Sequence, residues 1–182
     1  MRSTLRSLAP TSFDDVAALV ALYRPGPMAA NMHRDYPDLK NGRKPVTYLH
    51  PEMEAILGDT YGLMLYQESV MRVAQSFSGY SVEEADNLRR ACGKKNRVLI
   101  AAERKKFIAG CVHQGYDEAL GTQLFDIIEP FADYAFNKSH AYGYGLVAYQ
   151  TAWLKANHPV EYLAALLSSV KGDKDKTAVY LA

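Results

Sequence analysis

Helix start and stop signals divide this 182-residue sequence into short segments and leave little room for a β-sheet. The clearest start is the capping box at residues 81–84, Ser-Val-Glu-Glu, whose serine and glutamate side chains can each accept a backbone N–H at a helix beginning. Gly79, Gly93 and Gly115 supply stop signals, because glycine readily adopts the left-handed conformation that ends helices. Only residues 61–66, a short apolar run between turn residues, are typical of a strand. The sequence therefore predicts a mainly α fold with at most one or two short strands.

The expected helices show an apolar helical period or a recognisable cap and are separated by glycine, proline or polar residues. They cover residues 12–22, 51–57, 67–78, 81–93, 97–114, 117–135, 139–157 and 159–170. We expect a single domain over residues 1–182, because the length is ordinary for one domain. Residues 24–48 are polar and basic and contain Pro-Gly-Pro and Asn-Gly, which predicts a surface loop or arm. Residues 171–182 are expected to form a polar tail.

Composition limits the classes of function. The chain is 48% hydrophobic and 23% charged, which is ordinary for a folded domain, and its net charge of +1 means that any phosphate-binding surface must be local. The two cysteines and five histidines lack the spacing of a zinc site or a disulfide framework. Because no apolar run is long enough to cross a membrane and no secretion signal is recognisable, a cytoplasmic location is expected.

Two basic segments are candidate anion sites. Residues 137–140, Asn-Lys-Ser-His, open a predicted helix, where the asparagine or serine could simply cap the helix or the whole group could bind phosphate. Residues 88–97 contain five cationic side chains. Asp86 could neutralise Arg90 in an ordinary ion pair within a helix, or the surplus positive charge could contact a polyanion. The residues alone leave both alternatives open.

The helix predicted over residues 139–157 has two different apolar stripes. A stripe of larger side chains is expected to face the core: Tyr142, Leu146, Tyr149, Trp153 and Ala156. The neighbouring stripe is small enough for another backbone or a flat ligand to approach closely: Ala141, Gly145, Ala148 and Ala152. A glycine inside a helix costs about 1 kcal/mol relative to alanine, so close packing between helices is the expected reason for Gly143 and Gly145.

No self-contained catalytic centre is expected from the sequence. The only Asp-x-Asp motif, at residues 173–175, lies in the charged tail, where no strand would hold it rigidly for two-metal phosphoryl transfer. Motifs for a nucleophile triad or a phosphate-binding loop are also missing. We therefore expect no metal site within this sequence.

Three long segments resemble the fingers region of the bacterial C-family replicative DNA polymerase, the alpha subunit of DNA polymerase III. They are LVALYRPGPM, HPEMEAILGDTYGLMLYQESVMRVAQSFSGYSVEEADNLRRACGKK and FNKSHAYGYGLVAYQTAWLKANHPVEYLAALLSS. The similarity runs in order from about residue 5 to residue 170, which is nearly the whole chain. The resemblance implies a helical fingers domain that binds the incoming dNTP and template-primer DNA for nucleotidyl transfer.

The resemblance also implies that the catalytic aspartates lie in a palm upstream of this sequence. That palm would bind Mg²⁺ in the complete enzyme, so no cofactor is expected in this chain and the isolated chain is expected to be inactive. The implied partners are dNTP, template-primer DNA, the remainder of the polymerase chain and the replisome, and no membrane.

Residue by residue, the resemblance places two elements near the triphosphate. They contain Arg89, Arg90, Lys94 and Lys95 in one element and Asn137, Lys138, Ser139 and His140 in the other. DNA contacts are expected from the Arg-Pro-Gly-Pro loop and from the basic arm, through Arg24, Arg34, Lys40, Arg43 and Lys44. Tyr66 and Gln67 match a Tyr-Gln-Glu element that is interpreted as structural.

Two alternatives to the polymerase interpretation remain open. A non-catalytic nucleic-acid-binding module would use residues 34–44 as its contact surface. A purely structural helical domain would carry these cations only as solvated charges. Protection of the amides around residues 89–95 and 137–140 by a nucleoside triphosphate is expected only for the polymerase.

Overall fold

The computed structural model describes residues 1–93, 97–131 and 136–181. Within these residues the chain forms α-helices and two short 3-10 helices but no β-strand, so the predicted mainly α fold is confirmed. The elements are α1 (Arg2–Leu8), α2 (Phe13–Leu22), α3 (Pro25–Ala29), α4 (Met32–Lys40), η1 (Pro51–Met53), α5 (Glu54–Leu57), η2 (Gly58–Thr60), α6 (Gln67–Ser78), α7 (Val82–Gly93), α8 (Arg97–His113), α9 (Glu118–Phe131), α10 (Lys138–Asn157), α11 (Pro159–Ser169) and α12 (Lys174–Leu181).

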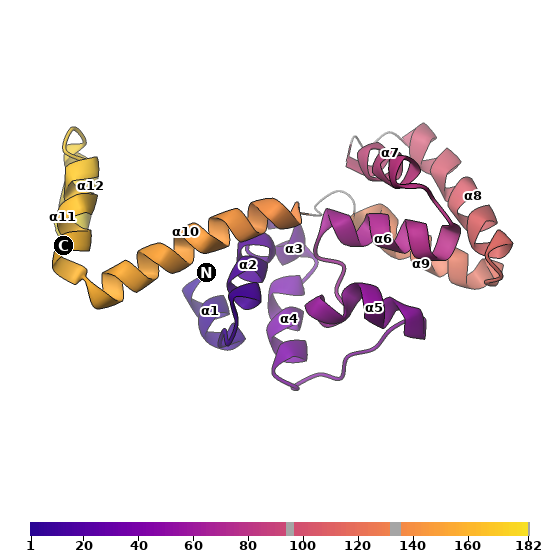
Figure 1. Ribbon diagram of the computed structural model, residues 1–182, viewed down its shortest axis with the longest axis horizontal. Helices are drawn as coiled ribbons and strands as arrows, with labels where there is room; N and C mark the ends of the chain where they lie inside the picture. Colours follow the sequence, from indigo (N-terminus) through magenta and orange to yellow (C-terminus); the bar gives the residue numbers. More distant parts are fainter. Residues whose placement is uncertain (94–96, 132–135, 182) are drawn as a thin grey trace.

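The helices form an elongated arrangement along which α10 is the longest single element (Figure 1). At one end, α6 packs against α7, α8 and α9. In the middle, α1 to α4 pack against one another, and α2 is the main partner of α10. At the other end, α11 contacts α10 and α12 (Figure 1). The first half of α10 is therefore packed into the domain, while its second half leads away from it.

One apolar core joins α6–α9 to the N-terminal helices. Phe77 on α6, Phe107 on α8 and Phe125 on α9 are fully buried, and the ring centroids of Phe107 and Phe125 lie 5.6 Å apart. Leu88 on α7 is also fully buried in this core. Because each such side chain contributes about 1.5–3 kcal/mol through burial, α7 is firmly held where it carries the predicted basic residues.

Side-chain caps begin α2 and α7. At α2, the Asp15 N–H donates to Ser12 Oγ at 3.3 Å, and the Ser12 N–H donates to Asp15 Oδ2 at 3.1 Å. At α7, the Ser81 N–H donates to Glu84 Oε2 at 2.9 Å, and the Glu84 N–H donates to Ser81 Oγ at 3.2 Å. Both capped helix starts were predicted from the sequence and are confirmed.

Residues 61–66 do not form the expected strand. Tyr61 and Gly62 have φ angles of 55° and 84°, so the backbone turns where a strand would be extended. Tyr66 makes an isolated parallel bridge to Phe136, just before α10. Met64, Leu65 and Tyr66 at the end of this segment are buried in the helical core instead.

The segment expected to be a basic loop, residues 24–48, contains α3 and α4, so that prediction is wrong for these residues. Pro25 begins α3, because a proline in the first turn loses no helical hydrogen bond. Tyr36, only 1% exposed, anchors α4 in the core. The expected polar tail contains α12, whose residues stay largely exposed. The helix predicted over residues 117–135 is present as α9 up to Phe131, and residues 132–135 lie outside the described residues.

The small side chains of α10 pack against α2. Ala141 and Gly145 are buried, and a Cβ added to Gly145 would lie 3.1 Å from the Cα of Ala17. Such a distance leaves no room for a larger residue, so the predicted close approach of another backbone is confirmed at Gly145. It is wrong for Gly143, because nothing lies within 4 Å of a Cβ added there. The prediction that the larger stripe faces the core is wrong, since Tyr149 and Trp153 are 52% and 47% exposed.

We expect Gly145→Leu to destabilise the chain by about 1–3 kcal/mol, because the new side chain would overlap the α2 backbone. Gly143→Leu is the matched control on the same helix, since nothing lies within 4 Å of a Cβ added there. It should be neutral or stabilise by up to about 1 kcal/mol, because leucine is the better helix former. Equilibrium denaturant unfolding measures both effects, and equal free energies of unfolding would contradict the packing.

The cap at Glu84 predicts a specific pH dependence. Hydrogen bonds from the Ser81 backbone and from Lys106 lower the pKa of Glu84 from 4.5 to about 2. Because the folded-state pKa lies below the unfolded one, the stabilisation is complete above about pH 4.5 and is lost as the pH falls toward 2.

Glu84→Gln should therefore flatten the decline in the free energy of unfolding between these pH values. Unfolding followed through an acid titration measures this, and Glu83→Gln on the same turn controls for the loss of one charge. If the free energy of unfolding falls with pH in parallel for Glu84→Gln and the wild-type protein, the Glu84 carboxylate contributes nothing to stability.

Candidate functional site

The predicted anion-binding segment, residues 137–140, forms the start of α10. Asn137 caps the helix, since its Oδ1 accepts the His140 N–H at 2.8 Å and the Ser139 hydroxyl at 2.6 Å. The Lys138 N–H donates to the carboxylate of Glu68 on α6, at 3.1 Å to Oε1 and 3.0 Å to Oε2. Asn137 therefore caps the helix, as one of the two alternatives predicted. The Glu68 carboxylate already lies at the positive end of the helix dipole.

Backbone hydrogen bonds attach this helix start to the start of α6. The Gln67 N–H donates to the Phe136 carbonyl at 3.0 Å, and the Phe136 N–H donates to the Leu65 carbonyl at 3.4 Å. These bonds and the Glu68 carboxylate fix the position of α10 relative to α6. Gln67, which the resemblance marked as structural, thus has a structural backbone role.

A small cavity of about 230 Å³ brings the two predicted elements together. It is lined by Gln67, Glu68, Met71, Asp86, Arg89 and Asn137. A second cavity of about 460 Å³ adjoins it at Asn137 and is lined by residues of the first turns of α10: Asn137, Ser139, His140, Gly143, Tyr144 and Val147. Arg89 and Asn137, which are distant in the sequence, therefore belong to one site.

Two of the predicted cations share one acidic partner. Arg89 Nη2 lies 2.7 Å from Asp86 Oδ1, and Arg90 Nε lies 2.7 Å from Asp86 Oδ2. Arg89 also donates to Gln67 Oε1 at 3.2 Å. The hydrogen bond from Arg89 and the charges of both guanidinium groups lower the pKa of Asp86. The predicted ion pair between Asp86 and Arg90 is confirmed, and an incoming anion would have to replace this carboxylate.

Lys138 has both an acidic and an aromatic environment. Its Nζ lies 2.6 Å from Asp59 Oδ2, and it lies 5.4 Å and 5.9 Å from the ring centroids of Tyr66 and Tyr142. Burial and a hydrogen bond to Asp14 raise the pKa of Tyr142 to about 12, so this phenol is neutral at physiological pH. The ammonium is therefore positioned by one carboxylate and two neutral rings.

His140 contacts two aromatic rings at the same helix start, one edge-on and one tilted. Its ring centroid lies 5.3 Å from that of Phe136 and 4.6 Å from that of Tyr144. Exposed aromatic faces beside cations can stack on a planar ligand such as a nucleobase. Tyr144 was not among the residues predicted for the site.

Lys94 and Lys95, the other predicted cations, lie outside the described residues. Sequence reasoning also missed two acidic members of the site, Asp59 and Glu68. Glu68 belongs to the Tyr-Gln-Glu element, whose third residue was a signal that was not used. No local pattern identifies Asp59, because its partner Lys138 lies 79 residues away in the sequence.

The residues predicted to contact DNA do not share one environment. Arg24 is exposed and lies over the ring of Phe136, 4.5 Å from its centroid, beside the start of α10. Lys40 is different, because its side chain is only 7% exposed and its Nζ lies 3.5 Å from Asp15 Oδ2. It also donates to the Ala9 carbonyl at 3.1 Å. The predicted role of Lys40 in DNA contact does not fit this buried position.

The remaining predicted DNA contacts lie at the surface of α4 and just after it. Arg34 is exposed on α4. Arg43 Nε lies 2.7 Å from Asp38 Oδ1, and Lys44 Nζ lies 2.5 Å from Asp35 Oδ1. The hydrogen bond to Asp35 raises the pKa of Lys44, so its ammonium is protonated.

The described residues show neither a potential metal-binding cluster nor a helix able to span a membrane. Within 1–93, 97–131 and 136–181, no three His, Cys, Asp or Glu side chains lie together so that they could hold a metal ion. In that part of the chain, no helix has the length and apolar composition needed to cross a bilayer.

Comparisons with known proteins agree with the sequence motifs. A family model described as the bacterial DNA polymerase III alpha subunit finger domain matches residues 1–115. DNA polymerase III subunit alpha of Mycobacterium tuberculosis (strain ATCC 25618 / H37Rv) is 55% identical over 186 residues, which cover 100% of this chain and 16% of the relative. The subunit of Caulobacter vibrioides (strain NA1000 / CB15N) is 47% identical over 180 residues, covering 99% of this chain and 16% of the relative.

A third relative, DNA polymerase III subunit alpha of Pseudomonas aeruginosa, is 44% identical over 186 residues and again covers 100% of this chain and 16% of the relative. The chain thus spans only 16% of the length of the relatives that it matches. The similarity extends across the elements of the candidate site and confirms the resemblance found in the motifs. The chain belongs to the bacterial DNA polymerase III alpha subunit family, and it corresponds to a fragment that includes the finger region.

Proposed function

We propose that this chain binds the incoming dNTP and template-primer DNA within a DNA-directed DNA polymerase that catalyses nucleotidyl transfer. The observation that carries this proposal is the cavity lined jointly by Arg89 of α7 and Asn137 at the start of α10. The resemblance relates both elements to the triphosphate, although they are far apart in the sequence. Membership of the polymerase family supports the same proposal.

The proposed role is positioning and charge stabilisation, which account for most of the catalysis in phosphoryl transfer. The guanidinium of Arg89 can donate two parallel hydrogen bonds to phosphate oxygens, and the Lys138 ammonium can add a compact positive charge. A phosphate that binds here replaces Asp86 or Asp59 as the partner of the cation. The net binding energy is therefore the difference between two charge-assisted pairs, not the full strength of one.

We propose that the catalytic aspartates and magnesium ions belong to the part of the polymerase outside this chain. Two-metal catalysis requires several carboxylates around one position. The described residues of this chain group no three potential ligands, so they do not fit such a site. The isolated chain is accordingly proposed to be inactive, and its residues contribute binding and orientation.

For DNA, we propose contacts through Arg24, Arg34, Arg43 and Lys44. Arg24 lies beside the start of α10, where a template could pass close to the nucleotide. The other three lie on or just after α4, with their charged groups at the surface. Lys40 is excluded from this proposal because of its buried pair with Asp15.

The purely structural alternative is favoured by one specific observation. Arg89, Arg90 and Lys138 each have an acidic partner without any ligand. Ion pairs at a protein surface contribute about 0–1 kcal/mol, so a structural role predicts a small loss of stability and an unchanged reaction rate. The nucleotide-binding role predicts the opposite pattern.

We expect Arg89→Ala and Lys138→Ala, each made in the full-length polymerase, to slow incorporation of all four nucleotides by similar factors. The triphosphate is common to every substrate, and a lost charge-assisted hydrogen bond of about 1.5–3 kcal/mol corresponds to roughly ten- to a hundredfold in rate. Pre-steady-state incorporation with each nucleotide measures the loss.

The chain offers closely matched controls for both variants. Arg104 is 32% exposed against 29% for Arg89, and it also pairs with carboxylates, those of Asp126 and Glu129. Lys106, like Lys138, pairs with an acid and lies over a tyrosine ring. Arg104→Ala and Lys106→Ala should leave the rates unchanged. If all four variants behave alike, the cations are structural, and a loss confined to one nucleotide would indicate base recognition.

We expect Arg34→Ala to reduce the salt dependence of template-primer binding by the full-length polymerase. Removing one phosphate contact should make the slope of log affinity against log salt shallower by about 0.9, because one fewer counterion is released. Lys40→Met is the control, since its buried ammonium should affect stability and leave the slope unchanged. An unchanged slope for Arg34→Ala would remove this residue from the DNA-contacting surface.

A further inference from the structure

The last part of the chain carries an apolar surface that no other described element covers. No residue between 146 and 181 is buried. Leu146 and Trp153 on α10 are 48% and 47% exposed, and Val160 on α11 is 75% exposed. Residues 146–170, from the middle of α10 to the end of α11, are here named the α10–α11 surface. Large apolar patches of this kind mark interaction sites in soluble proteins.

The helix α11 has the composition of a buried helix. Its sequence PVEYLAALLSS contains a single charged residue, Glu161, and its apolar residues occur on every side of the helix. A helix that is apolar all round normally lies in the core of a large protein or spans a membrane. Eleven residues are too few to cross a bilayer, which requires about 20 residues. The composition of α11 is therefore typical of a helix in the core of a larger protein.

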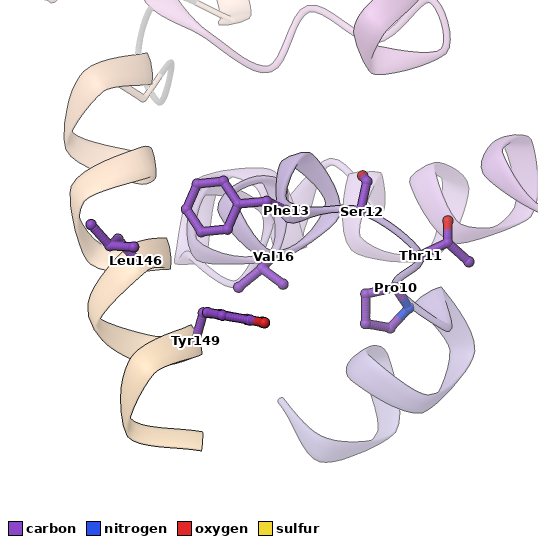
Figure 2. Close-up of a pocket in the computed structure, with 7 residues that line it drawn as sticks. All are labelled: Pro10, Thr11, Ser12, Phe13, Val16, Leu146 and Tyr149. Carbon is purple, nitrogen blue, oxygen red and sulfur yellow. The ribbon is translucent and has the colours of Figure 1, made fainter. Parts of the chain in front are cut away.

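A cavity between α2 and α10 extends this surface (Figure 2). It measures about 680 Å³ and lies between Phe13 and Val16 of α2 and Leu146 and Tyr149 of α10. The ring centroids of Phe13 and Tyr149 are 6.4 Å apart, so the rings form part of one apolar wall. A second cavity, of about 360 Å³, continues from Tyr149 past Trp153. Because Tyr149 lines both, the two cavities adjoin each other along α10.

The charge on the α10–α11 surface excludes two kinds of partner. Among residues 146–170, only Lys155 and Glu161 are formally charged. Nucleic acid needs several lysine or arginine contacts with phosphate. Helices that lie on a membrane surface are typically rich in basic residues on their polar face. The partner must therefore present an apolar protein surface.

We propose that the α10–α11 surface is an intramolecular interface, covered in the full-length protein by another apolar part of the same polymerase polypeptide. The matched region makes up only 16% of the relatives' length, so most of the polymerase lies outside this chain. A segment of the same polypeptide acts at an effective concentration in the millimolar range, whereas a second copy must overcome the full entropic cost of association.

The interface would hold the far end of α10, whose near end forms the candidate site (Figure 1). Its existence does not depend on nucleotide binding. The test below uses thiol reactivity, so its outcome is separate from that of the rate measurements.

We test the proposal with Val160→Cys and Ala165→Cys on α11, each in the full-length polymerase. Both residues are exposed in this chain, so the substitutions should not disturb its packing. A bulky maleimide is added to the monomeric fraction, and labelling is followed by peptide mass spectrometry, which separates these thiols from Cys92 and Cys111. Each rate is compared with that of the same variant after denaturation. Val82→Cys, on α7 and 68% exposed, is the matched control.

We expect the thiols introduced on α11 to be labelled at least about tenfold more slowly in the folded monomer than after denaturation. The control thiol on α7 should be labelled at close to the denatured rate. Labelling of both α11 thiols at the denatured rate would overturn the proposal, because the surface would then be open. Protection confined to a dimeric fraction would also overturn it and assign the surface to a second copy of the chain.

Discussion

The contact between the start of α6 and the start of α10 determines where the other groups of the candidate site lie. Two backbone hydrogen bonds join Gln67 and Leu65 to Phe136, and the Glu68 carboxylate accepts the Lys138 N–H. These bonds satisfy donors that a helix N-terminus otherwise leaves unpaired. Because α7 packs on α6, the same contact brings Arg89 to the cavity beside α10. A change at the α6–α10 contact would therefore move both predicted elements at once.

The packing of α10 on α2 has a second consequence for the rest of the molecule. The close approach at Gly145 uses the narrow side of α10. Of the larger side chains, Tyr149 still borders α2 through the ring of Phe13, whereas Trp153 lies farther along the helix and is 47% exposed. α10 is thus closely packed where α2 lies beside it and exposed where it extends beyond α2 (Figure 1). The helix links the candidate nucleotide site to a surface that we assign to the remainder of the polymerase (Figure 1).

Local sequence patterns were sufficient for most helices and for the family. The caps at Ser12 and Ser81 involve residues three positions apart, so both partners are visible in a short stretch of sequence. The pair of Asp86 and Arg90 follows from helical spacing in the same way. The basic elements containing Arg89 and Lys138 could be identified because their order matches a known family. In the caps and in the ion pair, the interacting groups lie close together along the chain.

By itself, the sequence determined the helical class, the main caps and the two elements that carry the cations. Only the tertiary structure decided which acid pairs with Lys138, since Asp59 meets it across 79 residues. The tertiary structure also placed Lys40, which lies in a segment predicted to be a loop, in a buried ion pair with Asp15. The tertiary structure also overturned the predicted buried face of α10: both of its stripes are apolar, and the larger one was expected to face the core. α2 packs against the side with Gly145, since only small residues allow two helix backbones to come so close.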